Sequence, residues 1–262
     1  MKGKIMAPAT ISNPVNLLDN SNFRNPINGR GAVHYTAGGY TIDRWIIWSV
    51  SGQQALTVGS GAVYWRGYMF QLLTIDRDAI YTLAIRTDDG RTVCVSGRPS
   101  QGAYYNVGNV SIGLTLYGSE NYVEAYMRTL DEVQASGVVW AALYEGTYTT
   151  DTLPPYVPRP YSVELAECRR WYLPLDASKS YEATRPFRDV LRFEVLGDFA
   201  RVPTLIGSIR GFGDDGVWHD LAVTSVDYRR DRTIFKLPGM DGFSTPGMTY
   251  LLTGASGVSC EL

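Results

Sequence analysis

The chain has 262 residues, and its 24 Lys and Arg residues against 26 Asp and Glu residues give a net charge of −2. This near-neutral balance argues against nonspecific binding of nucleic acid, which needs many cationic contacts to phosphate. With only 2 His and 3 Cys residues, we expect no disulfide framework, no dense metal site and no bound cofactor. No segment has the apolar core of a secretory signal or the length of a membrane span, so we expect cytoplasmic synthesis and no membrane insertion.

The first part of the chain has the pattern of a β-rich domain. We expect an N-terminal arm over residues 1–15 and a first domain over residues 16–153. Strand-forming aromatic and β-branched residues are dense at 40–50, 109–117, 121–130 and 137–148. Asp88–Gly90 separates two more such stretches and predicts a hairpin, because glycine adopts positive φ at little cost. With no helical period before residue 160, the pattern predicts an antiparallel β-sandwich or jelly roll.

A proline-rich segment follows this domain. Four prolines between Leu153 and Tyr161 favour an extended linker, which we place at residues 154–161. A short helix is then expected near residues 162–172, with Ser162 as its N-cap. Its predicted buried face contains Leu165, Cys168 and Tyr172.

The last part of the chain again predicts strands. Apolar and charged residues alternate over 191–195, as expected of a half-buried strand. Further strands are expected at 217–228, 233–237, 248–252 and 257–261. Residues 162–262 are therefore predicted to form the short helix and a smaller antiparallel β module, which makes the whole chain all-β.

Motifs of catalysis are largely missing from the sequence. There is no nucleophile elbow, phosphate-binding loop or zinc-protease motif. Gly211–Gly216 matches a dinucleotide-binding pattern, but the strand expected after it indicates a hairpin turn instead. Asp214, Asp215 and Asp220 could supply oxygen ligands to a calcium ion, so a calcium site is one hypothesis for this segment. A pair among the 26 acids could also serve a glycosidase, so an enzyme stays a minor alternative to a non-catalytic protein.

The aromatic residues point to a different kind of site. A sugar ring packs its apolar C–H face on an aromatic ring, while short polar side chains bind its hydroxyl groups. On this basis the candidate ligand-binding residues are Trp65, Tyr68, Tyr104, Tyr105, Asn106, Trp218 and His219. For Trp65, Tyr104, Tyr105 and Trp218, packing in the core or between subunits fits the sequence equally well. Trp45, Trp48 and Trp140 are predicted to lie in the core.

A second aromatic group surrounds the expected linker and helix. The candidate oligomerisation residues are Tyr156, Tyr161, Leu165, Cys168, Trp171 and Tyr172. We see little room for a partner to them within one chain, and exposing them all would leave a large apolar patch. Packing the same patch around a symmetry axis would remove it from water.

Two parts of the sequence resemble a known family. Residues 16–31 and 40–45 resemble the start of carbohydrate-binding-module-like domains in bacteriophage and prophage tail proteins. Residues 140–146 resemble the end of that domain, and residues 154–172 resemble its junction with a C-terminal module. The match covers about the first two thirds of the chain and includes no sugar-contact residues that can be assigned by position.

The resemblance implies a β-sandwich in a tail fibre or receptor-binding tip, located in the virion and in contact with other tail proteins, often as a homotrimer. Our leading interpretation is a non-enzymatic tail-tip protein that recognises bacterial surface glycan. A purely structural fibre or baseplate component without a glycan site is the main alternative. A carbohydrate-active enzyme, or its detached binding module, is the third.

Overall fold

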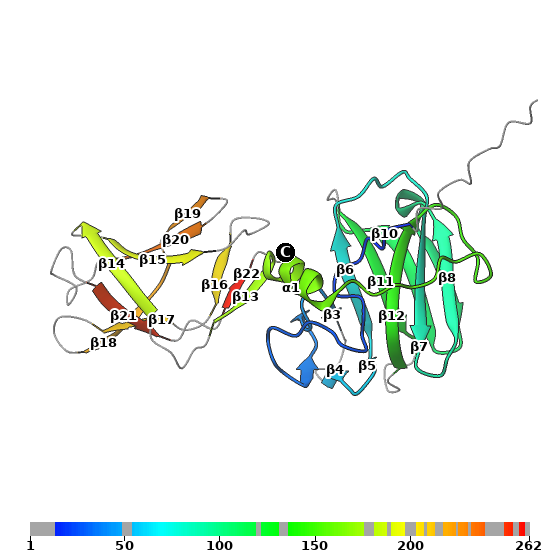
Figure 1. The fold of residues 1–262 in the computed structure, drawn as a ribbon, viewed down its shortest axis with the longest axis horizontal. Coiled ribbons are helices and arrows are strands. Elements are labelled where there is room, and N and C mark those ends of the chain that lie inside the picture. Colours follow the sequence, from blue (N-terminus) through cyan, green and yellow to red (C-terminus); the bar gives the residue numbers. More distant parts are fainter. Residues whose placement is uncertain are drawn as a thin grey trace, which may run out of the picture. The chain divides into compact units, whose positions relative to one another are not determined.

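The computed structural model shows a mostly β protein (Figure 1). It describes residues 14–48, 54–118, 122–130, 136–175, 181–187, 190–196, 203–206, 209–212, 217–223, 225–229, 232–238, 249–253 and 257–259. The chain divides into two compact units, the first within Met1–Asn25, Val33–Gly39 and Trp45–Pro158 and the second within Pro26–Ala32, Tyr40–Arg44 and Arg159–Leu262. The expected arm at residues 1–15 lies almost wholly outside the described residues, and independent folding of 16–153 and 162–262 stays a prediction.

The first unit contains two six-stranded antiparallel sheets, as a β-sandwich requires. In spatial order, the first sheet is β1 (His34–Thr36), β4 (Gln54–Val58), β5 (Val63–Trp65), β12 (Ser136–Glu145), β7 (Tyr81–Thr87) and β8 (Thr92–Gly97). The second sheet is β2 (Gly39–Tyr40), β3 (Ile46–Trp48), β6 (Tyr68–Leu73), β11 (Val123–Thr129), β10 (Val110–Leu116) and β9 (Ala103–Val107). A 3-10 turn, η1 (Pro99–Gln101), precedes β9.

The predicted hairpin at Asp88–Gly90 is confirmed. It joins β7 to β8, which pair in antiparallel register. Gly90 has a φ of 88° and donates its N–H to the Thr87 carbonyl at 3.1 Å. The Thr87 hydroxyl also donates to Asp89 at 2.6 Å. Positive φ at the glycine and a side-chain hydrogen bond thus close this turn.

The three tryptophans expected in the core have different environments. Trp45 is buried, donates its indole N–H to the Asn20 carbonyl at 3.0 Å and packs edge-on against Phe23, as predicted. Trp48 is 55% exposed at the end of the short strand β3, so its predicted burial is wrong. Trp140 is half-buried on β12, and its outward ring is covered by Tyr156 rather than by the core.

The second unit contains the short helix, α1 (Tyr161–Arg169), which begins one residue earlier than predicted. Pro160 is its N-cap, and the Pro160 carbonyl accepts the N–H groups of Val163 and Glu164, so the predicted cap at Ser162 is wrong. The buried helix residues are Glu164 and Cys168, four positions apart on one face. No helix in the described part of the chain has the length and apolar character of a membrane span.

Two antiparallel sheets complete the second unit. The smaller one, in spatial order, is β13 (Tyr172–Pro174), β22 (Gly257–Ser259) and β16 (Thr204–Ile206). The larger one is β18 (Trp218–Leu221), β17 (Ile209–Phe212), β21 (Thr249–Thr253), β14 (Tyr181–Phe187), β15 (Val190–Leu196), β20 (Arg232–Pro238) and β19 (Ser225–Arg229). The antiparallel pairing of β17 with β18 confirms that a strand and not a helix follows Gly211–Gly216.

Candidate functional site

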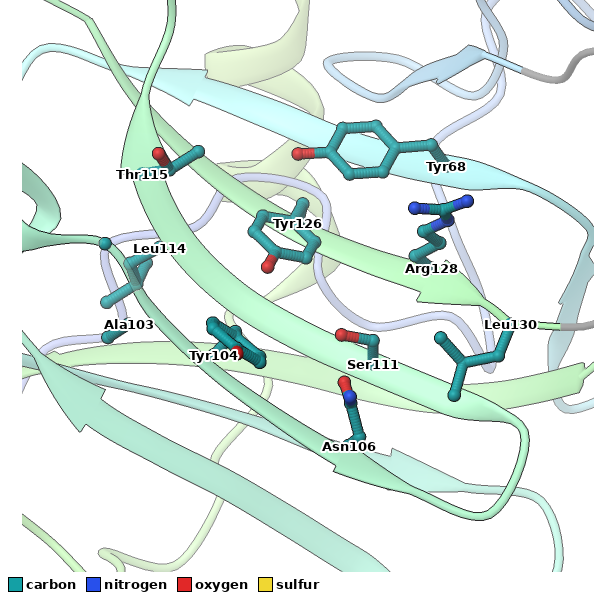
Figure 2. Close-up of a pocket in the computed structure, with 11 residues that line it drawn as sticks. Tyr68, Ala103, Tyr104, Asn106, Ser111, Leu114, Thr115, Tyr126, Arg128 and Leu130 are labelled. Carbon is teal, nitrogen blue, oxygen red and sulfur yellow. The ribbon is translucent and has the colours of Figure 1, made fainter.

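A pocket of about 400 Å³ lies on the outer face of the second sheet of the first unit (Figure 2). Its lining is mainly aromatic and polar and consists of Tyr68, Gly102, Ala103, Tyr104, Asn106, Ser111, Leu114, Thr115, Tyr126, Arg128 and Leu130. Three of the candidate ligand-binding residues, Tyr68, Tyr104 and Asn106, are therefore brought together from β6 and β9. The sheet pairing explains how residues so far apart in sequence meet.

The backbone register arranges the pocket residues in two rows across the sheet. Directly paired residues of an antiparallel sheet project from the same face. The first row consists of Tyr68, Arg128, Ser111 and Asn106, on β6, β11, β10 and β9. The second row, two residues further along the strands, contains Tyr126, Gly113 and Tyr104. The intervening residues Met69, Met127 and Ile112 are buried in the core, which leaves the two rows on the outer face.

Gly113 makes room for the ring of Tyr126. A Cβ atom at this position would lie 2.5 Å from the Cζ and Oη atoms of Tyr126 and 2.6 Å from the Ala103 carbonyl oxygen. The missing side chain therefore lets the tyrosine ring lie across β10. We did not predict this residue, although a lone glycine inside an apolar strand signals the close approach of another group.

Two tyrosines form the fixed part of the pocket. The rings of Tyr68 and Tyr126 stack with centroids 4.9 Å apart and planes inclined by 25°. The Tyr68 hydroxyl donates a hydrogen bond to Glu124, and the Tyr126 hydroxyl is hydrogen-bonded to Ser111. Burial, reinforced by the Glu124 carboxylate, raises the pKa of Tyr68 well above its ordinary value, so the hydroxyl remains a donor. Ring stacking and hydrogen bonds together hold both rings in place before any ligand arrives.

Glu124 lies two residues before Tyr126 on the same face of β11, and it was not predicted from the sequence. It is buried on β11, and its Oε1 atom has no hydrogen-bond partner. Burial raises the pKa of its carboxyl group, and the hydrogen bond from Tyr68 partly opposes that rise. A glutamate within a strand carries no sequence signal of such burial, because its environment depends on which strands pair beside it.

Tyr104 forms the accessible part of the pocket. It is 67% exposed on the edge strand β9, next to the exposed amide of Asn106. Figure 2 shows both side chains across β10 from Tyr126 and Arg128. Among the described residues that line the pocket, Arg128 is the one with a charged side chain. The site thus combines an open aromatic ring, neutral hydrogen-bonding groups and one cation.

Other candidate ligand residues lie elsewhere. Trp65 is 0% exposed between β4 and β12, so it cannot be an open stacking surface, and that prediction is corrected to core packing. Tyr105 projects from the opposite side of β9 to Tyr104 and lines a second cavity of about 470 Å³. Trp218 and His219 belong to β18 in the second unit, where Trp218 packs near the Phe212 ring at 5.3 Å. A ligand role for Tyr105, Trp218 and His219 stays a prediction.

The junction aromatics have partners within the chain, contrary to the premise of their predicted role. Tyr156 stacks on Trp140 with ring centroids 4.8 Å apart and planes inclined by 3°. In the second unit, the Arg44 guanidinium lies 3.8 Å from the Trp171 ring centroid. Tyr161 does remain 53% exposed at the start of α1. The large unpartnered patch that motivated self-association is therefore absent from the described residues, while oligomerisation itself stays a prediction.

The remaining junction candidates are Tyr172, Cys168 and Leu165, each of which is at least half-buried. The Arg30 guanidinium lies 4.0 Å from the Tyr172 ring centroid and pairs with the buried Asp43 carboxylate at 3.2 Å. Cys168 is buried and Leu165 is half-buried on α1. Because Tyr172 lies in β13 and not in the helix, it does not complete the predicted helical face.

The possible calcium site receives no support from the described residues. None of their His, Cys, Asp and Glu side chains gather in groups of three that could hold a metal ion. Asp220 pairs with Arg210 at 3.4 Å, and Asp214 and Asp215 lie outside the described residues.

The chain was compared with protein families, curated proteins and solved structures. No family model, curated protein or solved structure matches it. The likeness to phage tail proteins therefore depends on the sequence motifs alone.

Proposed function

We propose that the chain is a non-enzymatic glycan-recognising protein of a bacteriophage or prophage tail, and that the pocket formed by β6, β9, β10 and β11 is its sugar site. The observation that carries the proposal is an exposed Tyr104 ring beside a fixed aromatic pair and a row of polar groups. An apolar sugar face packs on Tyr104, while Ser111, Asn106 and Thr115 bind the hydroxyl groups.

The strand order supports a finer reading of the first unit as a jelly roll of the carbohydrate-binding-module type. The chain changes sheets six times, between β1 and β2, β3 and β4, β5 and β6, β6 and β7, β8 and β9, and β11 and β12. Two antiparallel sheets that exchange strands in this way are typical of jelly rolls. Such a fold offers a broad outer sheet face for a ligand.

The motifs at residues 16–31, 40–45, 140–146 and 154–172 support a place in the virion tail, among other tail proteins. A homotrimer belongs to this proposal because several copies of a weak sugar site gain avidity on a repetitive cell surface, by about 10²–10⁴ where the geometry permits. Light scattering tests this part of the proposal. A mass near 29 kDa means a monomer and would refute it.

A glycan array with two adjacent tyrosine variants tests the sugar site. Tyr104 and Tyr105 are 67% and 51% exposed, but they project from opposite sides of β9. Losing a stacked base costs about 1–3 kcal/mol in nucleic-acid complexes, and a sugar stacked on tyrosine should behave similarly. We therefore expect Tyr104→Ala to weaken binding by about 5- to 150-fold, and Tyr105→Ala to leave it unchanged.

Both variants should keep the melting temperature, because neither removes a buried ring. Equal binding by wild type and Tyr104→Ala would place the site elsewhere. Absence of binding to any bacterial surface glycan on the array would favour a structural tail component.

A further inference from the structure

We propose that the pocket selects an anionic saccharide and that Arg128 is the residue that recognises the charge. This inference rests on the proposed function, because it names the class of glycan that the same pocket would take. The ligand chemistry is a carboxylate or phosphate group attached to a sugar that packs on Tyr104.

Strand pairing places Arg128 on the face of the sheet that forms the pocket. The Arg128 backbone pairs with Tyr68 on one side and Ser111 on the other, in the row that ends at Asn106. The side chain is exposed, and Figure 2 shows it between Tyr68 and Ser111 on the pocket face. A guanidinium group at this place faces whatever occupies the pocket.

No acid in the described part of the chain neutralises the charge of Arg128. Among the described residues, no ion pair joins it to an acid, and no acid lines the pocket. Glu124 lies on the same face of β11, but it is buried and bonded to Tyr68. The pocket therefore presents a positive charge to a ligand.

The spacing of the strands matches a charged sugar unit. Arg128 and Tyr104 are two strands apart and offset by two residues along the strands, which corresponds to roughly 12 Å between their backbones. A pyranose ring on Tyr104 with an acidic substituent, or a neighbouring acidic unit, covers that distance. The planar guanidinium offers two parallel N–H donors that fit a carboxylate or a phosphate, and Ser111 and Asn106 lie in the same row for neutral hydroxyl groups.

The test uses bacterial polysaccharides in matched forms on one array. The panel holds carboxylated capsular polysaccharides, the same polymers with their carboxyl groups reduced to alcohols, phosphodiester-linked wall polymers and neutral polysaccharides. We expect wild type to prefer anionic polymers at least 10-fold, with the preferred arm identifying carboxylate or phosphate. Arg128→Gln should bind those anionic polymers with about 10- to 100-fold lower affinity and should bind neutral polymers as wild type does. Arg77→Gln is the matched control, because this exposed arginine lies outside the pocket lining.

The outcomes separate the two proposals. Equal binding of anionic, reduced and neutral polymers, with loss in Tyr104→Ala, overturns the choice of an anionic ligand and leaves the glycan site standing. An anionic preference that survives in Arg128→Gln overturns the role of Arg128. Absence of binding on every arm overturns the glycan site and this inference with it.

Discussion

Aromatic side chains in two regions of the molecule have opposite environments. On the outer face of the second sheet, Tyr104 is largely exposed beside a pocket. At the junction around α1, Trp171 and Tyr172 are covered by the guanidinium groups of Arg44 and Arg30. Both regions contain aromatic rings and arginine, so the difference comes from what the distant parts of the chain bring to each ring. An aromatic residue indicates a ligand site only where no other segment covers it.

Among the substitutions that test this comparison, Trp65→Ala is expected to have the largest effect on stability. The Trp65 side chain is 0% exposed, whereas Trp48 is 55% exposed on the other sheet. Removing a buried tryptophan leaves a cavity, so Trp65→Ala should lower the free energy of unfolding by about 3–5 kcal/mol. Trp48→Ala should change it by less than about 1 kcal/mol. Urea unfolding measures both, and a similar loss in the two variants would contradict the assignment of Trp65 to the core.

We expect the stability of the junction around α1 to depend on the buried carboxylate of Asp43. This buried carboxylate accepts the N–H of Gly29 and pairs with Arg30 at 3.2 Å. Because hydrogen bonds to charged groups contribute about 1.5–3 kcal/mol, Asp43→Ala should destabilise the protein by that amount. The exposed pair of Glu167 with Arg170 is the control, and Glu167→Ala should cost less than about 1 kcal/mol. Equal effects in thermal unfolding would mean that the covered junction is no more tightly held than the surface.

We expect Gly113→Ala to have a smaller effect on stability and a clear effect on glycan binding. The substitution pushes a methyl group against Tyr126, so the ring must move. Overpacking of this kind costs about 1–3 kcal/mol, and we expect glycan binding to fall with it. Gly39→Ala is the matched change, because a Cβ at Gly39 meets nothing within 4 Å. If Gly113→Ala binds the array glycans as wild type does, the fixed Tyr126 ring is not part of the site.

The smallest expected effect is a pH dependence of stability due to Glu124. Burial raises the pKa of this carboxyl above its ordinary value of 4.5. The folded state therefore holds the proton to higher pH than the unfolded state, and the resulting stabilisation is present below 4.5 and lost as the pH rises through the raised pKa. Glu124→Gln should remove this loss, so wild type should weaken relative to the variant above pH 4.5. Parallel pH profiles of the melting temperature in the two proteins would show that Glu124 titrates normally.

Much of the fold can be predicted from the sequence because it depends on local patterns. Alternating strands and the Asp88–Gly90 turn follow from residue periodicity and from the φ of Gly90. The environment of each aromatic residue is less predictable, because it depends on strand pairing. In Val63–Trp65, Tyr64 is exposed and Trp65 is buried, and only the position of the sheet decides which of the two faces the core.

The candidate site could be predicted in part. Tyr68, Tyr104 and Asn106 follow from the combination of aromatic and polar residues, and all three line the pocket. Gly113 and Glu124 enter only through the pairing of β10 with β11. The partners of Trp171 and Tyr172 come from more than a hundred residues earlier in the chain, which no local pattern reveals.

We propose that sugar binds on the outer face of the second sheet. The most direct test is to titrate the isotope-labelled protein with a glycan selected on the array and to map the NMR shift changes. We predict the largest changes at Tyr68, Tyr104, Tyr126 and Arg128, with small ones at Tyr105. Changes concentrated at Trp218 and His219, or around the second cavity beside Tyr105, would contradict the claim.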